Sequence, residues 1–225
     1  MDFTEMEAIG IYDWLIDGGD VKVRDPLDAH VLASILAIAA AEAKLSGLSI
    51  SEGTGMDVAT LATVLNEVFP HTLSLLESAG DCPELSIPED ERCLRELLLR
   101  STTKRTPFQL HLAVLIARRS TRPNHLWQDL GLGNRRQLSE LMHRHFEPLA
   151  RRNVNDMKWK KFFYRMICRD EGFRLCSAPS CAECDDFSVC FGDESGESFL
   201  ARNRRAADLH SITPMAPGEL QFRPV

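Results

Sequence analysis

Four cysteines lie within fifteen residues of one another near the C-terminal end of the chain. Cys176, Cys181, Cys184 and Cys190 form the pattern C-x4-C-x2-C-x5-C. Thiolates at this density repel one another unless a cation neutralises them or they are oxidised to disulfides. The segment is therefore predicted to be either a metal site or a disulfide framework, and the rest of the chain must distinguish the two.

The wider sequence argues against disulfides. The chain has seven cysteines, an odd number, and its 225 residues are enough for a core that needs no covalent staples. The acidic start, from Met1 to Glu5, lacks the basic and apolar segments of a secretory signal. The longest apolar run, Val31 to Ala43, is shorter than a membrane span and is predicted to be a buried helix. We therefore expect a cytoplasmic protein with reduced thiols and no contact with a membrane.

The spacing favours an iron–sulfur cluster over zinc. A structural zinc site usually takes two short hooks separated by a dozen or more residues, and only Cys181-x2-Cys184 forms such a hook. Plant-type ferredoxins use C-x4-C-x2-C with a distant fourth cysteine. The first three cysteines match that spacing, but Cys190 follows after only five residues. The pattern is more typical of a single loop wrapped around one cluster. Cys168 is predicted to be a small apolar side chain on a helix; the alternative is that it binds the metal or supports the residues that do.

The charge is unevenly distributed along the chain. Residues 1–91 carry a net charge of −15, residues 92–174 carry +12 and the remainder carries −4. The first interpretation is that the acidic part packs against the basic part. The second is that the basic part attracts an anion or an acidic partner. No recognition motif accompanies the basic residues, so we do not expect nucleic acid to bind.

The apolar spacing predicts an all-α fold: a helical, bundle-like domain with an irregular C-terminal cysteine-rich metal loop and a mobile tail. The predicted organisation is an acidic helical part (1–80), a basic helical part packed on it (81–175), the metal loop (176–191) and an extended or disordered tail (192–225). A first helix ends at Gly18, and Gly53 to Gly55 is predicted to be a loop. Further helices are expected over 28–46, 57–68, 89–101, 108–119, 125–130, 137–146 and 156–171.

The helical part offers little chemistry of its own. Trp127 and Trp159 are interpreted as core anchors. There is no nucleophile–base pair, phosphate-binding loop or dinucleotide-binding glycine pattern, so we do not expect an enzyme.

Three segments, in order, resemble the NifQ family. They are 123–132 (PNHLWQDLGL), 157–165 (MKWKKFFYR) and the cysteine loop that ends Cys190-Phe191-Gly192. The resemblance implies a protein of nitrogen fixation that carries an iron–sulfur cluster containing molybdenum. It further implies that the molybdenum is supplied for assembly of the nitrogenase iron–molybdenum cofactor. The implied partners are the cofactor scaffold complex, the nitrogenase iron protein, and molybdate or a molybdenum donor. The family motif falls on Cys176, Cys181, Cys184 and Cys190.

Two further groups of residues are candidates under this resemblance. His125 is either an additional molybdenum ligand or the cap of the short helix that follows it. The basic residues that could contact molybdate or an acidic partner are Arg151, Arg152, Lys158, Lys160 and Lys161. Two other functions remain open: an iron–sulfur protein for electron transfer or redox sensing, and a zinc-stabilised interaction module.

Overall fold

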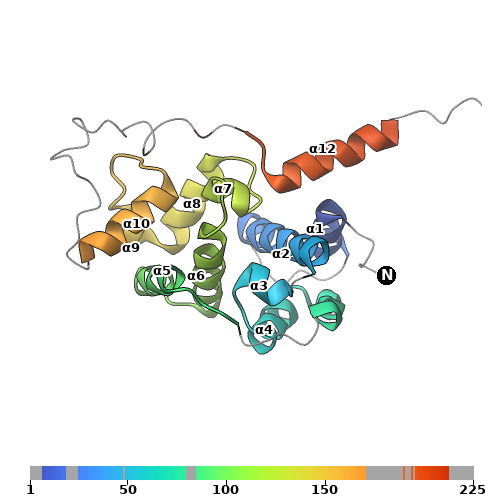
Figure 1. Cartoon of the computed structure of the whole chain (residues 1–225), viewed down its shortest axis with the longest axis horizontal. Coiled ribbons are helices and arrows are strands. Elements are labelled where there is room, and N and C mark those ends of the chain that lie inside the picture. Colours follow the sequence, from blue (N-terminus) through green and yellow to red (C-terminus); the bar gives the residue numbers. More distant parts are fainter. Residues whose placement is uncertain are drawn as a thin grey trace, which may run out of the picture.

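The computed structural model is helical and contains no strand over the residues that it describes, which are 7–18, 25–47, 49–79, 85–170, 190, 194 and 196–212. The all-α class predicted from the sequence is confirmed. The elements, labelled in Figure 1, are α1 (Ala8–Asp17), α2 (Pro26–Ser46), α3 (Ile50–Thr54), α4 (Val58–Val68), η2 (Pro70–Ala79), α5 (Glu89–Arg100), α6 (Pro107–Ser120), α7 (Leu126–Asp129), α8 (Arg135–His145), α9 (Glu147–Ala150), α10 (Trp159–Asp170) and α12 (Phe199–Ile212). Residues 53 and 54, expected in a loop, instead end the short helix α3.

Helix α2 is buried around most of its circumference. It begins where the Asp25 carboxylate accepts a hydrogen bond from the Leu27 N–H at 2.9 Å, and it ends at Gly47, whose φ of +68° suits glycine. Side chains from Val31 to Ala41 are buried almost without exception, and α1 and α3 pack against the helix. The prediction of a buried helix over Val31 to Ala43 is confirmed.

Helix α2 is also long and apolar enough to cross a membrane, when judged by length and composition alone. The helix is longer than the apolar run in the sequence because it also includes residues 26–30 before the run and residues 44–46 after it. Of its most apolar window, 67% is buried inside the protein. A core helix passes the same test, so the finding is weak support for a membrane span.

A single hydrophobic cluster joins the first and second halves of the helical part. It runs from Ile11 in α1 to Met166 in α10, and it includes Trp127 and Trp159, each 3% exposed. The interpretation of both tryptophans as core anchors is confirmed. Helix α3 packs on α6, and α5 packs on α10, so the amphipathic faces of the later helices close over the same core.

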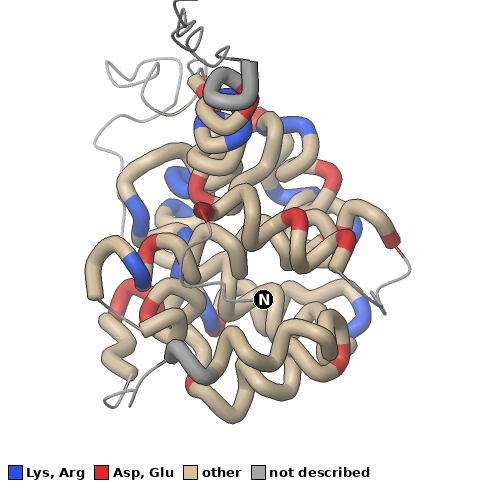
Figure 2. Tube along the Cα trace, turned by 90° about the vertical axis from the view of Figure 1, so that its right-hand side faces the viewer, with Lys and Arg blue, Asp and Glu red and all other residues tan. Residues whose placement is uncertain are grey.

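Ion pairs connect the acidic and basic parts of the chain. The buried Arg119 guanidinium donates to both carboxylate oxygens of Glu42, at 2.7 and 2.9 Å, and to the Asp129 carbonyl at 2.8 Å. Asp28 lies 2.8 Å from His145 Nε2 and 3.3 Å from an Arg144 nitrogen. Figure 2 shows basic and acidic positions interleaved along the helices rather than separated onto two sides. Part of the charge asymmetry in the sequence is therefore paired between the two parts of the fold.

The C-terminal segment differs from the extended tail that was expected. Residues Phe199–Ile212 form helix α12, which lies across α1 and α2 (Figure 1). Its buried contact is Leu200, which is 6% exposed and belongs to a small cluster with Ala8, Ile9, Ile38 and Ala41. Residues 213–225 of the predicted tail lie outside the described residues.

Candidate functional site

Cys190 is the one member of the cysteine motif that lies among the described residues; Cys176, Cys181 and Cys184 fall outside them. Cys190 is half-buried and packs against the edge of the main core. Its carbonyl accepts a hydrogen bond from the Lys158 backbone N–H at 2.9 Å. The end of the cysteine motif is therefore attached to the residue that precedes α10.

A tight turn before α10 holds Lys158 in place. The Asn153 side chain both accepts from the Met157 N–H and donates to the Met157 carbonyl, each at 2.9 Å. Asp156 has a φ of +50°, and Arg135 from α8 donates to its carbonyl at 2.7 Å and to its carboxylate at 2.8 Å. The Lys158 carbonyl then accepts from the Phe162 N–H at 2.9 Å, which begins the helix. One face of α10 packs into the core, because four apolar residues recur on it at helical spacing: Trp159, Phe162, Phe163 and Met166.

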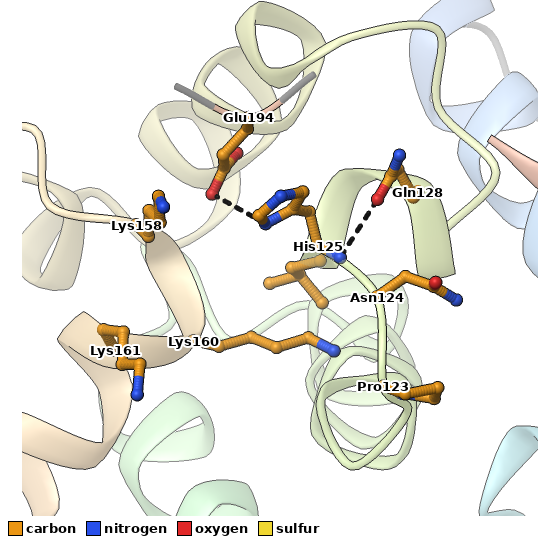
Figure 3. Close-up of a pocket in the computed structure, with 9 residues that line it drawn as sticks. Pro123, Asn124, His125, Gln128, Lys158, Lys160, Lys161 and Glu194 are labelled. Carbon is orange, nitrogen blue, oxygen red and sulfur yellow. Dashed lines mark hydrogen bonds and ion pairs between the residues drawn. The ribbon is translucent and has the colours of Figure 1, made fainter. Parts of the chain in front are cut away.

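A pocket of about 520 Å³ opens beside this turn (Figure 3). Its walls come from the segment before α7, from α7 itself, from the start of α10 and from Glu194. The lining residues are Pro123, Asn124, His125, Leu126, Gln128, Lys158, Lys160, Lys161 and Glu194. Three lysines and one glutamate therefore line a common volume, and the summed formal charge of these four side chains is positive.

Glu194 is the acidic member of the pocket, and its side chain is only 5% exposed. Its Oε1 lies 3.5 Å from His125 Nδ1 and 3.4 Å from Arg135 Nη1. Figure 3 shows the Glu194 carboxylate beside the His125 ring, with a dashed line between them. The second carboxylate oxygen, Oε2, is buried and has no hydrogen-bond partner among the described residues.

Lys160 lines the pocket with a largely buried side chain. Its ammonium lies 2.5 Å from the Asp129 carboxylate and donates to the Arg122 carbonyl at 2.5 Å. Burial lowers the pKa of Lys160, and the hydrogen bond and charge of Asp129 oppose that effect. Asn124 donates to the other Asp129 oxygen at 3.0 Å, so Lys160, Asp129 and Asn124 form a connected polar network.

The pocket brings together four of the residues that the sequence marked as candidates: His125, Lys158, Lys160 and Lys161. Arg151 and Arg152 do not line it; both are exposed, and Arg151 pairs with Glu147 at 2.6 Å within its own segment. Cys168 is half-buried on α10 and does not line the pocket. His125 stands at the N-cap of α7, where the Gln128 side chain accepts from its backbone N–H at 3.1 Å.

Glu194 and Asn124 are pocket residues that the sequence did not single out. Glu194 follows Cys190 by four residues, and Asn124 lies inside the first of the three family-like segments, so sequence position offered a signal for both. Nothing in the sequence indicated that Glu194 would turn back toward His125 and Arg135. No cluster of three or more His, Cys, Asp or Glu side chains suited to a metal occurs within the described ranges. Because three cysteines of the motif lie outside those ranges, the predicted metal site remains a prediction.

Comparison with known proteins gives one consistent result. Residues 31–192 match the NifQ family, a range that includes all four cysteines of the motif. The chain is 40% identical over 175 residues to a protein NifQ homolog from Sinorhizobium fredii, covering 76% of this chain and 74% of that protein. It is 37% identical over 151 residues to the NifQ protein of Azotobacter vinelandii, covering 62% and 77% respectively.

A third relative is the NifQ protein of Rhodobacter capsulatus, which is 42% identical over 120 residues and covers 51% of this chain and 66% of that protein. No solved structure matches the chain at a significant level.

Proposed function

Because the chain belongs to the NifQ family of nitrogen-fixation proteins, we propose that it carries a molybdenum–iron–sulfur cluster and supplies its molybdenum for assembly of the nitrogenase iron–molybdenum cofactor. The observation that carries the proposal is that the family match extends over the whole C-x4-C-x2-C-x5-C motif. In this proposal the cluster is cargo: the protein binds it and later passes its molybdenum on.

The donor set of the motif suits such a cargo. Cys176, Cys181, Cys184 and Cys190 offer soft thiolate ligands, which favour iron and reduced molybdenum over hard cations. Cys190 is half-buried at the edge of the core, and its backbone is held by Lys158. An anchored residue at the border of a loop could keep one ligand fixed while the cargo is exchanged.

The proposed partners are the cofactor scaffold complex and the nitrogenase iron protein, with molybdate or a molybdenum donor as the source of metal. We propose a cytoplasmic location and no turnover chemistry. The helical part is expected to serve as a platform that presents the cysteine loop.

The proposal is tested by metal analysis of protein purified without oxygen from cells that assemble clusters and are supplied with molybdate. The wild-type protein is expected to contain iron, sulfide and molybdenum, and to lose molybdenum when it is mixed with the scaffold complex and the iron protein. Cys190→Ser and Cys181→Ser are expected to lose most of the molybdenum. Cys93→Ser, which removes a thiol on α5 outside the motif, is the matched control.

Two results would contradict the proposal. Iron without molybdenum would indicate an electron-transfer or redox-sensing protein. A single zinc ion per chain, without the visible absorption of an iron–sulfur cluster, would indicate a zinc-stabilised module. His125→Ala separates the two roles of that residue: unchanged molybdenum content would reject a ligand role and leave His125 as the N-cap of α7.

A further inference from the structure

We propose that the pocket between α7 and α10 binds a tetrahedral oxyanion of the molybdate class, in competition with the Glu194 carboxylate. This inference rests on the proposed function, because it identifies where the oxidised metal would be held before it enters a cluster. It concerns the described residues of the pocket and requires no bound cluster.

The charge of the pocket favours an anion. Lys158, Lys160 and Lys161 all come from the beginning of α10, and each lines the pocket. Lys160 is committed to Asp129, whereas Lys161 is exposed at the rim. The stems of Lys158 and Lys161 are long enough for their ammonium groups to follow an anion that enters.

The backbone adds to this charge. The first intrahelical bond of α10 runs from the Phe162 N–H to the Lys158 carbonyl, so the N–H groups of residues 159–161 have no acceptor four residues earlier within the helix. The positive end of the helix dipole therefore lies at the same place as the three lysines. The lysines and the N-terminus of α10 therefore both contribute positive potential to the same pocket.

Glu194 is the residue that an incoming oxyanion would replace. The carboxylate is nearly buried, and its Oε1 is held at 3.4 to 3.5 Å by Arg135 and His125. Its Oε2 has no hydrogen-bond partner among the described residues, which is unfavourable for a buried charged atom. A tetrahedral oxyanion offers four oxygens to the Arg135 guanidinium and the His125 ring. The present carboxylate is thus an imperfect internal ligand.

The hydration of the ion, rather than the pocket volume, favours a large oxyanion. At about 520 Å³ the pocket exceeds what one tetrahedral anion occupies, so water remains as a bridge between ligand and lysines. Removing part of the hydration shell costs less for a larger ion of the same charge. Molybdate and tungstate are therefore expected to bind more tightly than sulfate or phosphate.

Anion binding would also affect the cysteine motif. Glu194 follows Cys190 by four residues, and Lys158 joins the Cys190 carbonyl through its backbone while its side chain lines the pocket. Displacement of Glu194 therefore acts on the segment that ends the motif. Arrival of the oxyanion and the position of Cys190 are expected to be coupled.

The test is equilibrium dialysis of the metal-free, full-length chain against sodium molybdate at fixed ionic strength. The double variant Lys158→Gln/Lys161→Gln is expected to bind about tenfold more weakly than the wild type. The matched control is Lys44→Gln/Lys104→Gln, which removes the same charge from two exposed lysines outside the pocket. Glu194→Gln is expected to bind several-fold more tightly, because it removes the competing charge and keeps the side-chain shape.

Equal affinity of the pocket and control double variants would overturn the proposal, as would weaker binding by Glu194→Gln. Equal affinity for molybdate, sulfate and phosphate would overturn the assignment to the molybdate class. The test of this inference can fail without the proposed function failing, and the reverse is also true. Oxyanion binding without molybdenum delivery would refute the carrier role alone, and delivery by a protein whose pocket binds no oxyanion would refute this inference alone.

Discussion

His30 is a half-buried histidine at the contact between α1 and α2. Its Nδ1 lies 3.0 Å from the Tyr12 hydroxyl and 3.4 Å from the Ser34 hydroxyl. A hydroxyl that donates to Nδ1 requires that nitrogen to be unprotonated. Burial lowers the pKa of His30, and the positive charge of Arg204 on α12 lowers it further. The folded protein therefore favours the neutral ring.

This shift predicts a loss of stability in mild acid. The unfolded chain begins to protonate His30 near its ordinary pKa of about 6.5, whereas the folded chain resists protonation until lower pH. The free energy of unfolding should thus be fully supported by His30 above that pH and should fall below it, by at most about 1.4 kcal/mol per pH unit for one proton. His30→Gln is expected to reduce this fall.

The measurement is urea denaturation at pH 7.5 and 5.5. His143→Gln, which changes an exposed histidine on α8, should behave like the wild type. If wild type and His30→Gln lose the same free energy between the two pH values, the buried ring is not the source of the acid sensitivity.

Helix α12 is attached to the rest of the protein by few contacts. Leu200 supplies the buried apolar contact, Arg204 pairs with Asp13 at 2.9 Å, and the same guanidinium lies over the Tyr12 ring at 6.0 Å. Most other described side chains of the helix are exposed. An element held this way is expected to detach at a lower free energy than the core unfolds.

Leu200→Asp should therefore release α12 and leave the core intact, because a carboxylate cannot replace the apolar contact with Ile9 and Ile38. Limited trypsin digestion should cut after Arg202, Arg204 or Arg205 about tenfold faster than in the wild type. Leu200→Met, which keeps the volume and the apolar character, is the control. Equally fast cleavage within residues 89–170 would show that α12 is instead integral to the core.

The elements also show what the sequence could and could not predict. Asp57 and Thr106 cap the helices that follow them, and these helices begin within one residue of the predicted starts. Helix α2 begins two residues earlier than predicted, after a cap at Asp25. Helix α10 begins at Trp159, three residues later than predicted, because Asn153 and Arg135 hold the preceding residues in a turn. That turn depends on a residue of α8, and such distant contacts leave no periodic signal.

In the candidate site, too, local features were predictable from the sequence and contacts between distant residues were not. His125 and the three lysines of 158–161 were identifiable because their types and spacing are local properties of the sequence. Their convergence on one pocket, and the entry of Glu194 into it, depend on how α7, α8 and α10 pack. Helix α12 was missed because its charged residues and the prolines beyond it resemble an unstructured segment, while its anchor is a single leucine.

At the scale of the whole molecule, the main hydrophobic cluster of the described residues is built from helices outside the cysteine motif. The main cluster extends from Ile11 to Met166, and Cys190 contacts only its edge. The fold is therefore expected to persist without metal, unlike small domains that fold only when metal binds.

A variant with serine at positions 176, 181, 184 and 190 should keep its helical circular dichroism, with a Tm within about 5 °C of the wild type. Phe163→Ala, which empties a fully buried position on α10, is the sensitivity control and should cost roughly 3–5 kcal/mol. Collapse of the helical signal in the serine variant would contradict an independent core.

The hydrogen bond from the Lys158 N–H to the Cys190 carbonyl makes that amide a natural spectroscopic probe. Its proton points at a peptide group of the cysteine motif, and its own residue lines the pocket. In nitrogen-15-labelled protein, the backbone amide resonance of Lys158 should shift when an anion is titrated into the pocket. It should also shift when the Cys190 thiolate binds or releases a metal. One backbone amide would thus record, in real time, the order in which oxyanion and thiolate are engaged.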